Sequence, residues 1–195
     1  MTKGMHPHEY VRSLLLANRA IRQIELSTYI NVPESLTDRR ESFCVRAEDV
    51  ERRFGALAKS LSAEEEIAFH SRVQVEGAPG RLRPRHFPLL DFKTADSGVA
   101  EDASERLVAE HEAPRAALFT SGHSYHLYMD LLLSDAQWTK FMGRVLLLNP
   151  REGPAIVDNR WVGHRLMSGF GALRWSANTP PYTQPPRLLR RWGTV

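Results

Sequence analysis

The sequence is poor in cysteine and has no long hydrophobic run. Cys44 is the one cysteine among 195 residues, so no disulfide can form within the chain, as is usual in a reducing compartment. No apolar run approaches the ~18 residues that a membrane-spanning helix needs. The first ten residues, MTKGMHPHEY, have neither the apolar core nor the cleavage site of a signal peptide. We therefore expect a cytoplasmic protein that does not contact a membrane.

The sequence also lacks the patterns of two common kinds of catalytic or metal site. His123 and His126 are an odd number of residues apart, so on a strand they point to opposite faces, and no cysteine pair lies near them to complete a zinc site. Neither Ser121 nor Ser124 lies in the GxSxG turn that exposes the serine of an esterase. The sequence thus argues against a zinc site and against a serine hydrolase.

Positive charge is in mild excess, and it is clustered. The formal net charge is +3, which suits a nucleic-acid or phosphate ligand without requiring one. Basic residues gather in RLRPRH, from Arg81 to His86, and in RLLRR, from Arg187 to Arg191. Taken alone, each cluster is more typical of a solvated loop or tail.

The length favours a single domain, and we divide residues 1–195 into three parts. Residues 1–62 are predicted to be helical, because apolar residues recur at helical spacing. Residues 63–178 alternate strands with short helices, and residues 179–195 form a tail rich in proline and arginine that wraps the surface or is mobile. The apolar positions behind the helical prediction are Val11, Leu14, Leu15, Ile21 and Ile24, then Val50, Phe54, Leu57 and Leu61.

The alternation of strands and helices in residues 63–178 predicts an α+β fold, with helices packed on one face of the sheet and the other face free for a ligand. Ser134 and Gln137 form a capping box that opens one of its helices. Strands are expected at 67–75, 86–94, 116–122, 125–133, 155–158 and 171–176, and helices at 103–112, from 134, and at 160–169.

Ionisable side chains lie on the less apolar face of two of these strands. Side chains alternate across a strand, so in YHLYMDLLL the residues His126 and Asp130 share a face opposite the apolar set. In LLDFK the same alternation places Asp91 and Lys93 opposite the leucine and phenylalanine, and Asp158 ends the apolar run AIV. If the strands belong to one sheet, these groups can converge.

The order of these pieces resembles the three-motif layout of the archaeo-eukaryotic primase superfamily, the prim-pols. In that family the first motif is two acids separated by one residue, the second is Ser-x-His, usually after Ser-Gly, and the third is an apolar residue followed by Asp. The matching stretches are LLDFK, SGHSYHLY and IVD, within Phe87 to Trp175. The sequence is similar to a bacterial primase-like group with a single aspartate in the first motif.

This resemblance implies a primase-like (RRM-like) fold with a mixed or antiparallel sheet. It also implies a nucleotidyltransferase that uses a nucleoside triphosphate and DNA or RNA, with Mg²⁺ or Mn²⁺ as cofactor. Carried over by position, Asp91 and Asp158 would bind the metal, while Ser124 and His126 would contact the triphosphate. Arg174 is the basic residue expected to hold the leaving pyrophosphate, ahead of Arg160.

Lys93 departs from the family pattern, because it stands where the second acid of the first motif would be. Three outcomes stay open: Asp96 or Asp130 supplies the missing ligand, one metal suffices with Lys93 holding phosphate, or catalysis is lost while binding persists. The last outcome gives the alternative function, an inactive nucleic-acid- or nucleotide-binding subunit with a protein partner in a bacterial replication or defence assembly. In both cases the basic cluster, through Arg81, Arg83 and Arg85, would contact nucleic acid.

Each residue also has an ordinary explanation. Asp158 precedes a helical pattern and could simply be its N-cap, and His126 could be a satisfied core or surface histidine. Asp91 and Lys93 could form an exposed ion pair, and Arg174 could pair with an acid or stack on a tryptophan. The ordered set, together with the shared face, favours the primase-like interpretation.

Overall fold

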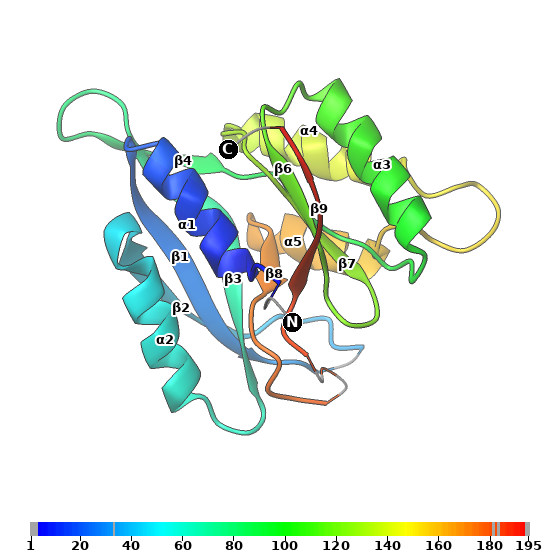
Figure 1. The fold of residues 1–195 in the computed structure, drawn as a ribbon, viewed down its shortest axis with the longest axis horizontal. Coiled ribbons are helices and arrows are strands. Elements are labelled where there is room, and N and C mark those ends of the chain that lie inside the picture. The colour runs from blue at the N-terminus through cyan, green and yellow to red at the C-terminus, as the bar shows by residue number, and fades with distance from the viewer. Residues whose placement is uncertain (1–3, 33, 181, 183, 194–195) are drawn as a thin grey trace.

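The computed structural model describes residues 4–32, 34–180, 182 and 184–193. These residues form two antiparallel sheets with helices packed against both (Figure 1). Residues 1–3 and 33 of the predicted helical part, and residues 181, 183, 194 and 195 of the predicted tail, lie outside this description. Within it, no helix has the length and apolar character needed to cross a membrane.

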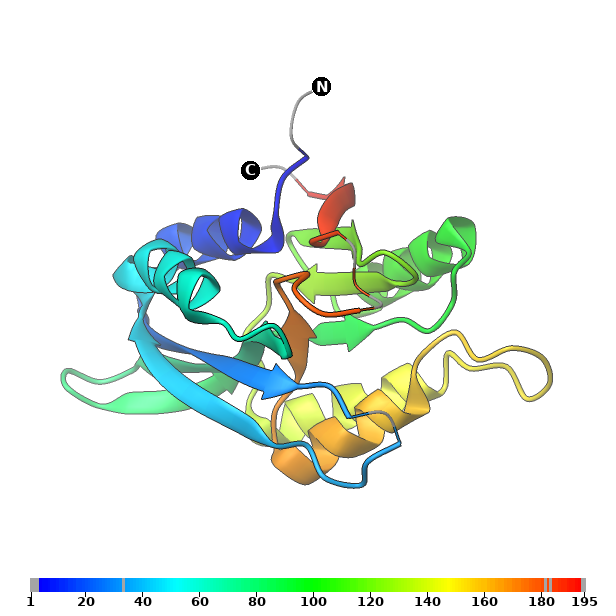
Figure 2. The ribbon, with the colours of Figure 1, turned by 90° about the horizontal axis from the view of Figure 1, so that it is seen from below.

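The first sheet has the strand order β2-β1-β3-β4, and β8 also pairs with β3. The long strand β3 makes this possible, because its residues 72–76 pair with β4 while residues 68–70 pair with β8 on the same edge. Apolar residues of α1 and α2 pack on one face of this sheet (Figure 2). The elements are α1 (Pro7–Ala17), β1 (Ile21–Ile30), β2 (Arg40–Arg46), a 3₁₀ turn (Ala47–Asp49), α2 (Val50–Ser60), β3 (Glu65–Glu76), β4 (Leu82–His86) and β8 (Ala172–Arg174).

The second sheet has the strand order β5-β7-β6-β9. Alternate side chains of its strands enter two different cores. Leu90, Leu118 and Leu127 pack with the helices α3, α4 and α5, whereas Phe119 and Tyr128 pack with the first sheet and α1. The elements are β5 (Leu89–Asp91), α3 (Ser97–Glu110), β6 (Ala116–Thr120), β7 (Tyr125–Met129), α4 (Asp135–Leu146), α5 (Asn159–Ser168) and β9 (Arg187–Trp192).

The predicted fold class is confirmed: the protein is α+β, with antiparallel sheets and helices packed on them. The face of the second sheet that we expected to be free for a ligand is largely covered by the first sheet. Tyr128, which by strand alternation shares that face with His126 and Asp130, is 1% exposed. A ligand can therefore reach only the end of this face.

The prediction of a helical N-terminal part is wrong for residues 21–46, which contain β1 and β2. Ile21 and Ile24 are three residues apart, which is a helical spacing, yet both are buried in the same core from a strand. Register shifts between β1 and β3, consistent with β-bulges, fall on either side of Ile24. Such irregularities change which residues share a face, so bulged strands can imitate a helical pattern.

Smaller differences concern where strands begin and end. The predicted strand 86–94 is divided between the end of β4 and β5, with Phe87 and Pro88 between them, because proline cannot donate to a sheet ladder. The predicted strand 155–158 is reduced to one bridge between Val157 and Phe92. The capping box of Ser134 and Gln137 is confirmed at the start of α4.

The C-terminal tail is not merely a surface wrap, because β9 pairs with β6 as the edge strand of the second sheet. Gly193 follows directly after β9 with a positive φ of 76°, and an added Cβ there would lie 2.0 Å from the carbonyl oxygen of Pro114. Only glycine allows this close approach. The prolines thus precede an ordered element.

Candidate functional site

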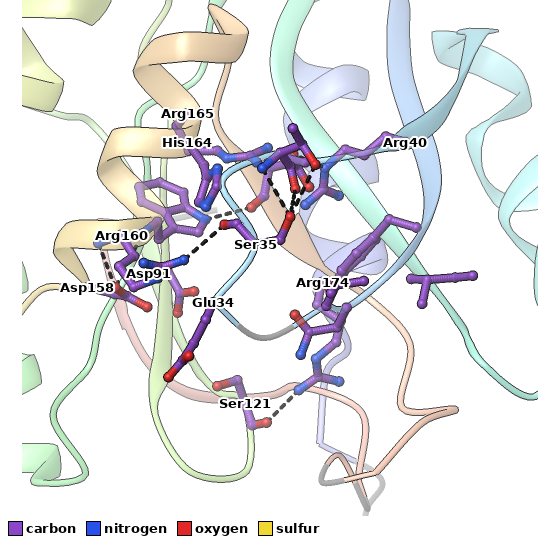
Figure 3. A pocket seen from close by; sticks show the side chains of 18 of the residues that line it. Glu34, Ser35, Arg40, Asp91, Ser121, Asp158, Arg160, His164, Arg165 and Arg174 are labelled. Atoms are coloured by element: carbon purple, nitrogen blue, oxygen red, sulfur yellow. Dashed lines mark hydrogen bonds and ion pairs between the residues drawn. The ribbon is translucent and has the colours of Figure 1, made fainter.

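A pocket of about 280 Å³ lies between the two sheets. It is formed by the described residues of the β1–β2 loop (31–32 and 34–39), the end of β5, the β6–β7 turn (121–124), the start of α5 and β8 (Figure 3). The residues predicted from the sequence that line it are Asp91, Ser124, His126, Asp158, Arg160 and Arg174.

Asp91 and His126 face each other across the β5–β7 ladder. They are directly paired in register, and His126 Nε2 lies 3.6 Å from Asp91 Oδ1. His126 is 4% exposed, and its Nδ1 is buried without a hydrogen-bond partner in the described part of the chain. Burial, together with the charge of Arg174, lowers the pKa of His126 well below its usual value. The imidazole is therefore neutral at physiological pH.

Asp158 is held next to Asp91 by the backbone. Its N–H donates to the Asp91 carbonyl oxygen at 3.4 Å, and Phe92 forms the bridge to Val157. Asp158 Oδ1 accepts from the backbone N–H groups of Arg160 and Trp161, which makes it the N-cap of α5. The cap explanation is thus correct, but it uses only one carboxylate oxygen.

The two carboxylates repel each other. Burial is the largest cause that raises the pKa of Asp91, the charge of Asp158 adds to it, and the two effects outweigh Arg174 and Arg165 to give a pKa of about 8. The side chain of Asp91 is still about one-quarter exposed. A cation between these acids would relieve the repulsion and favour the ionised form.

The β6–β7 turn brings the serines of the second motif to the pocket. Ser121 N–H donates to the Ser124 carbonyl at 2.8 Å, and the two hydroxyls lie 2.9 Å apart. Gly122 has a φ of 108°, which favours glycine in this tight turn. His123 is exposed whereas His126 is buried, so these histidines do not act together.

Arg174 is buried at the opposite side of the pocket from Asp158 (Figure 3). It donates to the carbonyl oxygens of Ser121, at 2.6 Å, and of Ser176. Its guanidinium lies 3.9 Å from the centre of the Tyr182 ring. Carbonyl groups fix its position but do not neutralise it, so its positive charge is available to an anion.

Other predicted residues do not line this pocket. Lys93 is exposed, and its backbone N–H donates to the Ile156 carbonyl at 2.8 Å. Asp96 caps α3, and Asp130 pairs with Arg115, so neither supplies the missing acid. Arg81, Arg83 and Arg85 lie on or beside the β3–β4 hairpin, which projects from the far end of the first sheet (Figure 1).

The sequence interpretation missed a second group of charged residues in the pocket: Asp38, Arg40 and Arg165. Arg165 follows Asp158 by seven residues, with Trp161 between them. This i, i+3, i+7 spacing places all three on one face of α5 and could have identified Arg165. Asp38 and Arg40 approach it only through the tertiary fold.

The donor set suits one hard divalent cation. Carboxylate oxygens are the ligands that Mg²⁺ prefers, and Mg²⁺ is commonly bound by one or two carboxylates together with substrate phosphates. Asp91 and Asp158 provide two such groups. The described residues contain no group of three or more Asp, Glu, His or Cys side chains placed to hold a metal, so water and substrate would complete its coordination.

Comparisons with known proteins agree on the fold. A family model described as archaeo-eukaryotic primase 1D-like matches residues 48–187, which is more than half of the chain. Among solved structures, the polymerase domain of Mycobacterium tuberculosis ligase D in complex with DNA is similar, with a TM-score of 0.53 and 15% identity, over 95% of this chain and 84% of that one. No curated protein matches the sequence.

Proposed function

The chain belongs to the archaeo-eukaryotic primase 1D-like family, and from this premise we propose that it is a primase-polymerase-type nucleotidyltransferase. Its substrates would be a nucleoside triphosphate and a strand of DNA or RNA, and Mg²⁺ or Mn²⁺ would be the cofactor. The observation that carries this proposal is the meeting of Asp91, His126 and Asp158, from three separate segments, in one pocket.

In the proposed reaction, a strand 3′-hydroxyl attacks the α-phosphorus of the nucleotide. A new P–O bond forms, the bond to pyrophosphate breaks, and the hydroxyl proton is released to solvent. The metal, held by Asp91 and Asp158, would neutralise charge on the phosphates. Ser124 donates its hydroxyl proton to a phosphate oxygen, neutral His126 donates its one N–H, and Arg174 supplies a fixed positive charge beside the departing pyrophosphate.

Asp158→Asn tests the metal-binding role without removing the helix cap. Asparagine caps helices about as well as aspartate, so the substitution removes the charge and preserves the bonds to Arg160 and Trp161. Asp96→Asn is the matched control, because Asp96 caps α3 through the same pair of backbone bonds outside the pocket.

The measurement is nucleotide affinity with and without Mn²⁺. We expect Mn²⁺ to strengthen binding in the wild type and in Asp96→Asn, and to have no effect in Asp158→Asn. Equal wild-type affinity in the presence and absence of Mn²⁺ would contradict the proposal.

Lys93 favours a second candidate, an inactive subunit that binds nucleotide or nucleic acid next to a protein partner. The described residues contain no group of three or more Asp, Glu, His or Cys side chains placed to hold a metal, and the similar ligase polymerase domain was solved with DNA. A primer-extension assay separates the candidates, because extension by the wild type excludes an inactive subunit. If only Lys93→Asp extends a primer, the site is a degenerate polymerase.

A further inference from the structure

Arg40 and Arg165 share a single carboxylate within the pocket. Arg40 Nε donates to Asp38 Oδ2 at 2.6 Å, and Arg165 Nη2 donates to the same oxygen. Both arginine side chains are at least nine-tenths buried, with 2% exposure for Arg165 and 10% for Arg40. Two positive charges thus face one negative charge in a region of low solvent access.

Arg165 has hydrogen-bonding capacity that Asp38 does not use. Its Nε and Nη1 are buried and have no partner among the described residues. The acid Glu25 of β1 does not supply a partner, because it is paired with Arg72 and His70. Buried donors without partners are costly and rare, so this arrangement indicates a group that binds a larger anion.

Asp38 belongs to the β1–β2 loop, which is tied to α5 at two points. One is the contact with Arg165, and the other is the bond from Arg160 Nη2 to the Ser35 carbonyl at 2.9 Å. The side chain of Leu36 between them is 79% exposed, so little apolar packing fixes the loop. Partial burial acts to raise the pKa of Asp38, but Arg40 and Arg165 outweigh it and lower the pKa below the usual value.

Phosphate matches this pair of arginines better than a carboxylate does. Guanidinium groups bind phosphate oxygens through parallel N–H donors. A terminal phosphate carries about −1.5 to −2 charges and three acceptor oxygens. It can therefore balance both arginines and also reach donors that Asp38 leaves unpaired.

We propose that Arg40 and Arg165 form a phosphate subsite, which Asp38 fills in the absence of ligand and which a phosphate group of the substrate occupies in its place. The subsite rests on the proposed function, since it lies in the same pocket, but it is separate from Ser124 and Arg174. The phosphate belongs either to the nucleoside triphosphate or to the nucleic-acid strand.

The test is binding of inorganic tripolyphosphate without metal to wild type, Asp38→Asn and Asp102→Asn. The last variant makes the same charge change at an exposed position of α3, outside the pocket. We expect Asp38→Asn to bind several-fold more tightly than wild type and Asp102→Asn to differ little. An equal gain in both variants would overturn the subsite, because the gain would then reflect net charge alone.

Arg165→Met identifies which residue receives the anion. The gain from Asp38→Asn should disappear in the Asp38→Asn/Arg165→Met double variant, and a gain that persists there would overturn the proposal. Since a buried arginine is replaced, the melting temperature of each variant is measured with and without tripolyphosphate. The ligand should raise it most in Asp38→Asn, and an equal rise in Asp38→Asn and Asp102→Asn would also count against the subsite.

Two further titrations of Asp38→Asn distinguish the sources of the phosphate. If Asp38→Asn binds a nucleoside triphosphate more tightly than the wild type does, the subsite belongs to the nucleotide. If it binds a 5′-phosphorylated oligonucleotide more tightly, the subsite belongs to the strand. A gain for neither overturns the subsite. These titrations contain no metal, whereas the test of the proposed function measures the effect of Mn²⁺ on nucleotide affinity. A negative result for the subsite can therefore be distinguished from a negative result for the proposed function.

Discussion

Asn149 fixes the segment that carries Asp158, and its replacement should weaken metal binding. Its Oδ1 accepts from the backbone N–H groups of Ile156, at 2.7 Å, and Val157, at 2.8 Å. Its Nδ2 donates to the Val157 carbonyl at 3.3 Å and to Asn159 Oδ1 at 2.5 Å. A side-chain amide has two donors and two acceptor positions, and all four are used.

The size of the effect follows from these four bonds. A hydrogen bond within a protein contributes a net ~0.5–1.5 kcal/mol, so the loss of four such bonds in Asn149→Ala should lower the free energy of unfolding by roughly 2–6 kcal/mol. Asp158 would also lose its fixed place beside Asp91. Residues that orient metal ligands typically change metal affinity about 10- to 100-fold when mutated, and we expect roughly a tenfold loss for Mn²⁺.

The assay combines a Mn²⁺ titration, followed by electron paramagnetic resonance, with denaturant unfolding. Asn178→Ala is the control, because Asn178 donates two side-chain hydrogen bonds, to the carbonyls of Ser62 and Glu65, and it does not line the pocket. It should lose stability and retain Mn²⁺ affinity. If Asn149→Ala binds Mn²⁺ as the folded wild type does, Asn149 does not position Asp158.

Three further predictions concern other parts of the chain. Gly193→Ala should lower stability by about 2 kcal/mol or more through backbone strain and collision with Pro114; an unchanged denaturation midpoint would show that β9 is not an integral strand. Burial, then His8, lowers the pKa of His6 to about 4, below its usual ~6.5. Between these two pKa values the unfolded chain binds more protons than the folded one. The contribution of His6 to the free energy of unfolding should therefore be complete above pH 6.5 and decrease toward pH 4, by up to ~1.4 kcal/mol per pH unit. His6 is the N-cap of α1, and His6→Asn keeps an N-cap acceptor. This variant should flatten the pH dependence of the free energy of unfolding, and a slope equal to the wild type's would refute the reasoning. Replacing Arg81, Arg83 and Arg85 by alanine should make duplex DNA binding less dependent on salt. The slope of the logarithm of the binding constant against the logarithm of the salt concentration should become shallower by about 0.9 for each phosphate that these arginines neutralise in the wild type. An unchanged slope would exclude them from the interface.

The sequence predicted the centre of the pocket because local alternation determines which side chains share a strand face. Asp91 and His126 were placed on comparable faces of two strands, and the β5–β7 register then brings them directly opposite each other. The motif order supplied the third member, Asp158. What alternation could not reveal is that the first sheet covers most of this face.

The remaining pocket residues depend on contacts between distant segments. Asp38 and Arg165 are 127 positions apart, and nothing in the local pattern of either segment indicates the other. The sequence pattern also did not predict the β1–β2 hairpin that carries Asp38. Ile21 and Ile24 have a helical spacing in the sequence, and register shifts in β1 allow both to enter the same core from a strand. Long-range pairing and bulges thus account for the two residues of the β1–β2 hairpin that the sequence interpretation missed, Asp38 and Arg40.

If Asp91 and Asp158 are the carboxylates of the proposed metal site, metal and nucleotide should bind together rather than separately. Asp91 and Asp158 offer fewer ligands than the roughly octahedral shell of Mg²⁺ requires, so phosphate oxygens must complete it. Binding is reciprocal: the factor by which nucleotide raises Mn²⁺ affinity equals the factor by which Mn²⁺ raises nucleotide affinity. Titrating Mn²⁺ with and without a non-hydrolysable nucleoside triphosphate measures this factor. Mn²⁺ that binds equally well without nucleotide would mean that the protein supplies ligands beyond these two carboxylates, and the proposed metal site would be wrong.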